Sequence, residues 1–183
     1  MLKKFKTDLD KYRRYSNNSV IILLVSQQGL WALFVYRINN SIYKRRIPVI
    51  LKRPLLLIGL FFQKMIEIIT GISLPYSAEI GSSCYIGHFG GIIINARAII
   101  GRNCNISQGV TIGVSGRGSN RGVPIIGDSV YIGVNAVLAG KIEIGDQVVV
   151  AANSLVTRSV PCKKTVMGVP AEVVSENTSN FYI

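Results

Sequence analysis

Aliphatic residues recur every six positions along the chain from Leu74 onward. The pattern contains one step of eight residues and one of fourteen, and every other step is six. Glycine often follows the aliphatic residue directly, and a small or β-branched residue often stands four positions after it. The aliphatic positions are Ile80, Ile86, Ile94, Ile100, Ile106, Ile112, Ile126, Ile132, Leu138, Ile144, Val150 and Val156, and the small or β-branched positions are Ala78, Cys84, Ala98, Cys104, Val110, Val130, Ala136, Val148 and Ser154.

A six-residue repeat of this kind predicts short strands with inward aliphatic side chains, separated by tight corners. Three such sides close a coil of about 18 residues, and each coil stacks on the last at about 4.8 Å, the spacing of paired strands. The predicted fold is therefore mainly β, a parallel β-helix over residues 72–174. A loop at residues 114–125 leaves the coil, and residues 175–183 form a C-terminal tail.

Residues 1–71 have a different pattern, with basic residues at the start and long aliphatic runs that predict helices. The stretch from Tyr15 to Tyr36 is 22 residues long and carries no charge, which is enough for a membrane span. Its centre holds Ser26, Gln27, Gln28 and Gly29, and positive charges flank both ends. We therefore expect packed or interfacial helices in preference to a spanning one.

The net charge of +12 is concentrated in the helical region. Residues 1–71 hold 13 Lys and Arg against 3 Asp and Glu, a net of +10, and residues 72–183 hold 8 against 6, a net of +2. No nucleic-acid-binding motif accompanies the excess, so a nucleic-acid partner is not expected. Basic residues interleaved with aliphatic runs favour contact with an anionic membrane surface. The alternative is that these helices only pack against each other and against neighbouring subunits.

The three cysteines, Cys84, Cys104 and Cys162, show no pairing pattern, and no cleavable signal peptide precedes them. Both observations favour a reducing cytoplasm. The predicted location is cytoplasmic, with peripheral attachment at the inner face of the membrane, and the cysteines are predicted to be small buried residues.

The only histidine, His88, lies where the repeat takes its step of eight residues. Two residues must therefore bulge out of the coil within "HFGGII", where Gly90 and Gly91 permit unusual backbone angles. Counting three sides onward places Gln108, Val134 and Ala152 in line with His88. Imidazole is the side chain best suited to accept a proton near neutrality, so His88 is the candidate catalytic residue.

The chain resembles the hexapeptide-repeat acyltransferases, and among them the serine acetyltransferases. The resemblance rests on "IGHFGGIIINARAIIGRNCNISQGVTIG", "IIGDSVYIGVNAVLAGKIEIGDQVVVAANSLVTRSVP" and "VMGVPAEVV". It implies a left-handed β-helix, a homotrimer or dimer of trimers, acetyl-CoA as co-substrate without a metal, and His88 as general base. It also implies that the pantetheine arm of CoA runs along the column of Val134 and Ala152.

Four positions depart from the serine acetyltransferase pattern. Ser73 and Gly87 stand where those enzymes carry aspartates that orient the imidazole and contact serine. Gly122 and Val123 stand where they carry the arginine and histidine that hold the amino acid. A zwitterion bound without paired charges is costly to desolvate, so the sequence favours a changed acceptor.

A sugar of a surface polysaccharide or glycan is the predicted acceptor, because it presents only neutral groups. Gln108, Arg117, Asn120 and Arg121 are the candidate acceptor-binding residues. The alternative acceptor is L-serine, which the terminal Ile183 supports, because serine acetyltransferases often end in an isoleucine that docks in their partner sulfhydrylase. A further alternative is a non-catalytic trimeric scaffold, which the intact histidine bulge disfavours.

Three basic residues near the last coil, Arg158, Lys163 and Lys164, are candidates for contact with the CoA phosphates. They fit equally well as a solvated face at the end of the β-helix.

Overall fold

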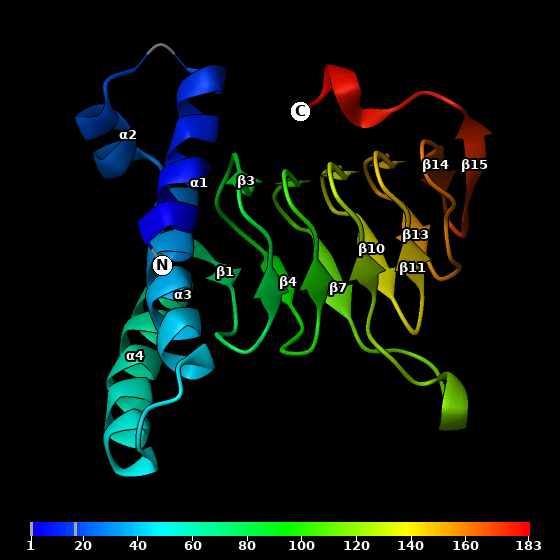
Figure 1. Ribbon diagram of the computed structural model, residues 1–183. Helices are drawn as coiled ribbons and strands as arrows, with labels where there is room; N and C mark the ends of the chain where they lie inside the picture. The colour runs from blue at the N-terminus through cyan, green and yellow to red at the C-terminus, as the bar shows by residue number, and fades with distance from the viewer. Residues whose placement is uncertain (1, 17) are drawn as a thin grey trace.

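The computed structural model describes residues 2–16 and 18–183. Four helices gather at one end of a long stack of coils, as Figure 1 shows. They are α1 (Leu2–Tyr15), α2 (Val20–Ser26), α3 (Gln28–Lys44) and α4 (Val49–Thr70). Ser19 caps α2 by accepting a hydrogen bond from the amide of Ile22, and α4 ends where Gly71 adopts a left-handed conformation with φ 66°.

The uncharged stretch from Tyr15 to Tyr36 is divided between helices, and Asn17 within it lies outside the described residues. Helices α2 and α3 meet at Gln27 with a bend of 88°. In the described parts of the chain, every helix taken alone is too short or too polar to cross a membrane, and only the bent pair of α2 and α3 has the required length and composition.

The strands form three sheets that run along the stack. The first sheet holds β1 (Ile72–Ser73), β4 (Ile92–Ile94), β7 (Thr111–Gly113), β10 (Val137–Ala139) and β13 (Leu155–Val156). The second holds β2 (Glu79–Ile80), β5 (Ile99–Ile100), β8 (Ile125–Ile126) and β11 (Glu143–Ile144). The third holds β3 (Tyr85–Ile86), β6 (Asn105–Ile106), β9 (Tyr131–Ile132), β12 (Val149–Val150), β14 (Thr165–Gly168) and β15 (Ala171–Ser175).

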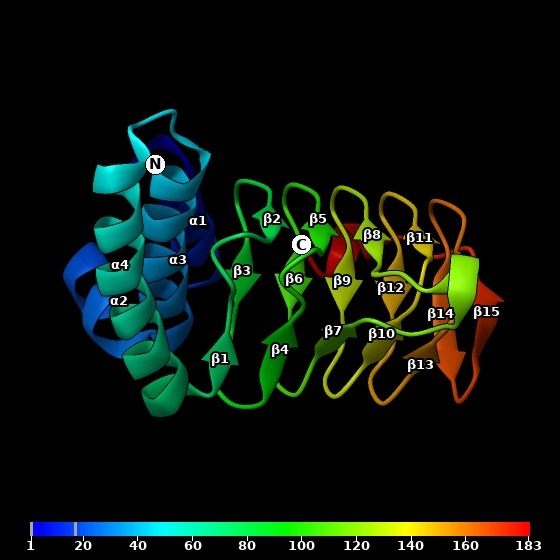
Figure 2. The same ribbon diagram turned by 90° about the horizontal axis from the view of Figure 1, so that it is seen from below.

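Pairing within the sheets is parallel between successive coils, and among the strands of the described residues β15 alone turns back antiparallel on β14. The chain visits the first, second and third sheets in turn, so each coil has three sides and three corners (Figure 2). The predicted parallel β-helix is confirmed.

The core of the β-helix consists of the residues that the repeat selects. All twelve periodic aliphatic side chains are buried, as are the small or β-branched residues from Ala78 to Ser154 that the repeat places at the corners. The prediction for the cysteines is correct for Cys84 and Cys104 and wrong for Cys162, which is exposed. Cys162 lies at a corner of the final coil, where no further coil covers it. Burial raises the pKa of Cys84 to about 12 and that of Cys104 to about 11.

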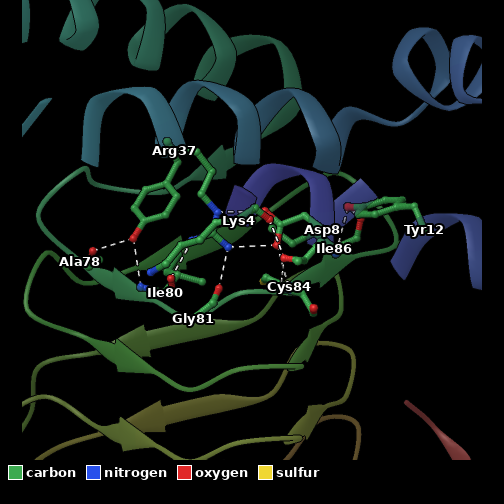
Figure 3. A network of polar contacts seen from close by, with 12 residues as sticks. Lys4, Asp8, Tyr12, Arg37, Ala78, Ile80, Gly81, Cys84 and Ile86 are labelled. Carbon is green, nitrogen blue, oxygen red and sulfur yellow. Dashed lines mark hydrogen bonds and ion pairs between the residues drawn. The ribbon is translucent and has the colours of Figure 1, made fainter. Parts of the chain in front are cut away.

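Polar side chains from the helices cover the open end of the β-helix, as Figure 3 shows. The Tyr12 hydroxyl donates to the carbonyl of Ile86 at 2.7 Å and accepts from the Ile86 amide at 3.0 Å. The Tyr36 hydroxyl donates to the Ala78 carbonyl at 2.8 Å and accepts from the Ile80 amide at 3.0 Å. These hydroxyls satisfy the strand edges that a preceding coil would otherwise pair.

A buried ion pair completes this cap. Asp8 of α1 and Arg37 of α3 lie 2.9 Å apart, with both side chains almost inaccessible to solvent. Asp8 also accepts from the Cys84 amide at 2.9 Å, and Arg37 donates to the carbonyls of Ile80 and Gly81 at 2.6 Å each. The pair is therefore fully hydrogen-bonded, as a buried pair must be to be tolerated.

The C-terminal tail folds back along the third sheet toward α1 (Figure 1). The carbonyl of Tyr182 accepts hydrogen bonds from Asn105 Nδ2 at 2.7 Å and from the Tyr15 hydroxyl at 3.0 Å. The Tyr182 ring lies 4.8 Å from that of Tyr131. In this conformation the residue before Ile183 is held by the chain itself.

Candidate functional site

His88 lies in a two-residue bulge at the corner between the third and first sheets. Ile86 pairs with Ile106, so two residues further along each strand His88 lies beside Gln108. Ile94 pairs with Ile112, so four residues earlier along each strand Gly90 lies beside Gln108 as well. The two extra residues are therefore accommodated between His88 and Gly90, and the side chains of His88 and Phe89 are both exposed.

The bulge is held in place by the end of α4. Gly90 and Gly91 have φ angles of 97° and 67°, which favour glycine. The Gly90 amide donates to the Thr70 carbonyl at 2.8 Å, and the Ile92 amide donates to the Gly71 carbonyl at 3.0 Å. A Cβ atom on Gly71 would lie 3.0 Å from the Gly90 Cα, so the close approach of these two segments requires glycine.

Gln108, Val134 and Ala152 follow His88 along the same corner. The amide of Asn135 donates to the Gln108 carbonyl at 3.0 Å, and the amide of Asn153 donates to the Val134 carbonyl at 2.8 Å, so successive coils are in register. We call this line of residues the His88 column. The Gln108 Oε1 atom is buried and has no hydrogen-bond partner among the described residues. The column thus offers small neutral side chains and one unsatisfied acceptor to a ligand.

The extruded loop leaves a different corner, between the first and second sheets. Backbone hydrogen bonds between Ser115 and Gly122, at 3.0 and 3.1 Å, close its base. Arg117, Asn120 and Arg121 are exposed on it. The loop runs along the stack toward the last coils (Figure 2). Within one chain, the structure does not bring these three residues to His88, and a shared site would need a neighbouring subunit.

A groove beneath the loop contains a residue that the sequence analysis missed. It has a volume of about 330 Å³ and is lined by Ser115, Asn120, Lys141 and Thr157 among others. The ammonium of Lys141 lies 3.4 Å from the Ser119 carbonyl. Because Glu143 pairs with Ile125, Lys141 occupies the place opposite Val123 on the next coil. Counting one coil of 18 residues onward from Val123 would have identified this cation.

The three basic residues near the last coil lie away from the His88 column. Arg158 is exposed at the loop corner, one coil beyond Lys141. Lys163 and Lys164 lie at the third corner, and Lys164 forms an ion pair with Glu176 of the tail. Within one chain, the structure therefore does not group them with Ala152.

The four departures from the serine acetyltransferase pattern are visible in the structure. Ser73 lies on β1 opposite Ile93, and the Tyr85 ring occupies the space that a side chain on Gly87 would need. Gly122 closes the loop base, and Val123 packs against the core. In residues 2–16 and 18–183, carboxylates form ion pairs with Arg37, Lys44, Lys64, Arg102 and Lys164. None of these pairs involves His88.

Comparisons with known proteins agree with this architecture. The family described as "Bacterial transferase hexapeptide (six repeats)" matches residues 124–158. A serine acetyltransferase of Staphylococcus aureus is 32% identical over 179 residues, which cover 97% of this chain and 80% of that protein. This chain belongs to the serine acetyltransferase family. The predicted resemblance is confirmed, and the left-handed β-helix is the fold of this family.

Other members of the serine acetyltransferase family are longer than this chain. A serine acetyltransferase of Synechococcus elongatus is 35% identical over 152 residues, which cover 83% of this chain and 59% of that protein. The crystal structure of Neisseria gonorrhoeae serine acetyltransferase matches with a TM-score of 0.80 and 31% identity, covering 94% of this chain and 64% of that one. A Brucella abortus serine acetyltransferase in complex with coenzyme A matches with a TM-score of 0.82 and 27% identity, covering 96% and 68%.

Proposed function

We propose that this chain transfers the acetyl group of acetyl-CoA to a hydroxyl group, with His88 as the general base. The observation that carries the proposal is the position of His88, exposed in a bulge at the head of the His88 column. The small side chains of Val134 and Ala152 leave that column open to an extended ligand. Gln108 Oε1 is buried without a hydrogen-bond partner among the described residues, and a polar group of the ligand or of the acceptor that reached it would satisfy it.

The chemistry requires one proton transfer and one exchange of bonds. His88 removes the hydroxyl proton of the acceptor as its oxygen attacks the thioester carbonyl. The new C–O bond forms, the C–S bond breaks, and the proton passes to the departing thiolate to give free CoA. A neutral imidazole is sufficient for this task, and positioning the two reactants supplies much of the acceleration.

L-Serine is the acceptor that the comparisons support, and they favour it over the sugar predicted from the sequence. The relatives from S. aureus and S. elongatus are serine acetyltransferases, and N. gonorrhoeae serine acetyltransferase is also known in complex with serine. Lys141, together with Arg117 and Arg121 of the loop, offers cations for the carboxylate of serine. In a trimer, the loop of one subunit would approach the His88 column of the next.

A sugar hydroxyl is the second candidate acceptor. The specific observation in its favour is the simultaneous change at Ser73, Gly87, Gly122 and Val123, which removes the charges that the family uses for serine. A neutral acceptor has no ammonium group to pair, so it loses nothing from these changes.

The test is release of free CoA thiol from acetyl-CoA, measured with L-serine and separately with a panel of hexoses, oligosaccharides and lipid-linked sugars. Saturable release with L-serine at millimolar concentration or below supports the first candidate. Release with a sugar and background rates with L-serine would replace it by the second. Background rates with every hydroxyl compound, in a preparation that is folded and oligomeric, would contradict acetyl transfer itself.

A further inference from the structure

Helix α4 presents a large apolar face that nothing in the described chain covers. In Figure 2 it lies at the helical end of the stack, with α3 on its inner side. Ile50, Leu57, Phe61 and Ile68 lie on one stripe of α4 and are 82%, 70%, 62% and 78% exposed. Such contiguous apolar exposure marks an interaction surface.

A cluster of cations lies at one end of this face, and we call it the basic rim. Lys44, Arg45 and Arg46 end α3 and begin the connection to α4, and Arg53 lies in the second turn of α4. Lys4 of α1 is close enough to Lys44 that their repulsion adds to burial in lowering the pKa of Lys4. The rim is therefore built by three helices. Lys44 pairs with Glu79 at 3.3 Å, whereas Arg45, Arg46 and Arg53 form no ion pair with the described residues.

An apolar groove runs between α3 and α4 beside the exposed stripe. Its volume is about 360 Å³, and its lining includes Phe34, Ile38, Leu55, Ile58 and Phe62. A groove lined almost wholly by carbon atoms suits an acyl chain or a large apolar side chain.

We propose that α4 docks in the interface of an anionic lipid bilayer, with its apolar stripe among the acyl chains and the basic rim on the headgroups. The charge of the region decides between a bilayer and a second copy of the chain. Residues 1–71 carry a net charge of +10, so pairing this region with itself brings like charges together, whereas an anionic surface neutralises them. An amphipathic helix with basic residues beside an apolar face is the usual design for such attachment.

This attachment places the His88 bulge near the membrane surface. Helix α4 ends at Thr70, whose carbonyl accepts the Gly90 hydrogen bond, and Ile68 and Ile69 are exposed in its last turn. Phe89, adjacent to His88, is itself 59% exposed. The His88 corner therefore lies at the end of the docking face, at the cytoplasmic side of the membrane in the location that the sequence analysis predicts.

Vesicle co-sedimentation of the full chain, without acetyl-CoA or acceptor, tests this proposal independently of the acetyl transfer. The vesicles are phosphatidylglycerol and phosphatidylcholine in equal parts, with pure phosphatidylcholine as the comparison. We expect binding to the anionic vesicles only, and release as salt is raised. The double variant Arg45→Gln/Arg46→Gln should partition about thirtyfold more weakly, from about five- to sixfold per cation.

Matched controls separate docking from general surface effects. The double variant Arg97→Gln/Arg102→Gln removes the same charge from the β-helix and should bind like the parent. Leu57→Gln/Phe61→Gln should lose binding, whereas Val169→Gln/Phe181→Gln, which changes two exposed apolar residues far from α4, should not. Circular dichroism verifies that each variant is folded.

Two outcomes would overturn the proposal. One is equal sedimentation, or none, with both kinds of vesicle. The other is a hexamer of the parent chain that Leu57→Gln/Phe61→Gln converts to trimers without affecting vesicle binding, because the apolar face of α4 would then be a contact between copies.

Discussion

The amide of Gly90 donates a hydrogen bond of 2.8 Å to the carbonyl of Thr70, the last residue of α4. This contact ties the bulge that carries His88 to the helical region, because Thr70 ends α4 and Gly90 belongs to the β-helix. The position of the candidate base is thus set jointly by the β-helix and by the C-terminal end of α4.

Gly71, at the junction between α4 and the His88 bulge, should be sensitive to substitution. In Gly71→Ala, the added Cβ meets Gly90 and must tolerate a φ of 66°, so we expect a loss of about 1 kcal/mol in unfolding free energy. Displacement of His88 should lower kcat by about 10- to 100-fold. Gly118→Ala is the control, because Gly118 also has positive φ, at 54°, but has no atom near its Cβ position. Equal kcat in the two variants would show that the junction does not position His88.

The hydroxyl of Tyr12 should contribute measurably to stability. In Tyr12→Phe, the buried amide and carbonyl of Ile86 lose their partner, so we expect unfolding free energy to fall by about 1–3 kcal/mol in urea denaturation. Burial raises the pKa of Tyr12 well above its ordinary value, so the hydroxyl remains a donor across the accessible pH range. Tyr43→Phe serves as control, since the Tyr43 ring is exposed and its contacts with Tyr76 and Lys52 are made by the ring. A Tyr12→Phe protein as stable as Tyr43→Phe would contradict the role assigned to the cap.

Deprotonation of Lys11 should raise the free energy of unfolding as the pH rises. Its ammonium donates to the carbonyl and the side-chain oxygen of Asn103 at 2.9 Å each, and burial lowers its pKa to about 8. In the unfolded chain the pKa of Lys11 has its ordinary value of about 10.4. Between about pH 8 and pH 10.4 the unfolded chain therefore binds more protons than the folded one, so the stability of the fold increases from about pH 8 upward. Thermal unfolding of the parent and of Lys11→Met at pH 7.5, 8.5 and 9.5 measures the difference in Tm.

That difference, parent minus variant, should grow by a few degrees over this range. Tyr36, Cys84 and Cys104 titrate in the parent and in Lys11→Met alike, so their effect cancels in the difference in Tm. A constant difference would mean that Lys11 titrates normally.

The β-helix could be predicted from the sequence because one physical constraint repeats in every coil. Each strand must place one aliphatic side chain inward, and Ile100, Ile126 and Ile144 therefore stack at successive turns of the second sheet. The helical cap could not be predicted in the same way. The hydrogen bonds of Tyr12 and Tyr36 to strand edges join residues more than forty positions apart and leave no periodic signal.

Only those residues of the candidate site that follow the six-residue repeat could be predicted from the sequence. The column from His88 to Ala152 follows from counting six residues at a time, and the structure keeps that register. Lys141 was missed because the count was followed only along the His88 corner, although Lys141 stands one regular coil of 18 residues after Val123. Arg158 and Lys164 lie on other corners than Ala152 within one chain, because nearness in sequence places residues on different corners of a triangular coil. Their contact with the CoA phosphates stays a prediction.

Lys141 distinguishes the two candidate acceptors. If the groove beneath the loop holds the carboxylate of serine, Lys141→Ala should raise KM for L-serine about tenfold or more, which is the loss of one charge-assisted hydrogen bond. The variant should change kcat much less, because the ground state and the transition state share this contact. Arg97→Ala, an exposed cation outside the groove, is the control. An unchanged KM for L-serine in Lys141→Ala would remove the groove from serine binding.

The most direct test of the account is the rate of CoA release by His88→Ala. We expect a folded oligomer that still binds CoA and transfers acetyl groups about 10² to 10⁴ times more slowly than the parent, because no other described side chain on the His88 column can accept the hydroxyl proton. Phe89→Ala, a change in the same bulge that leaves the imidazole in place, should lose less than tenfold. Turnover by His88→Ala within a few-fold of the parent would contradict the assignment of His88 as the base.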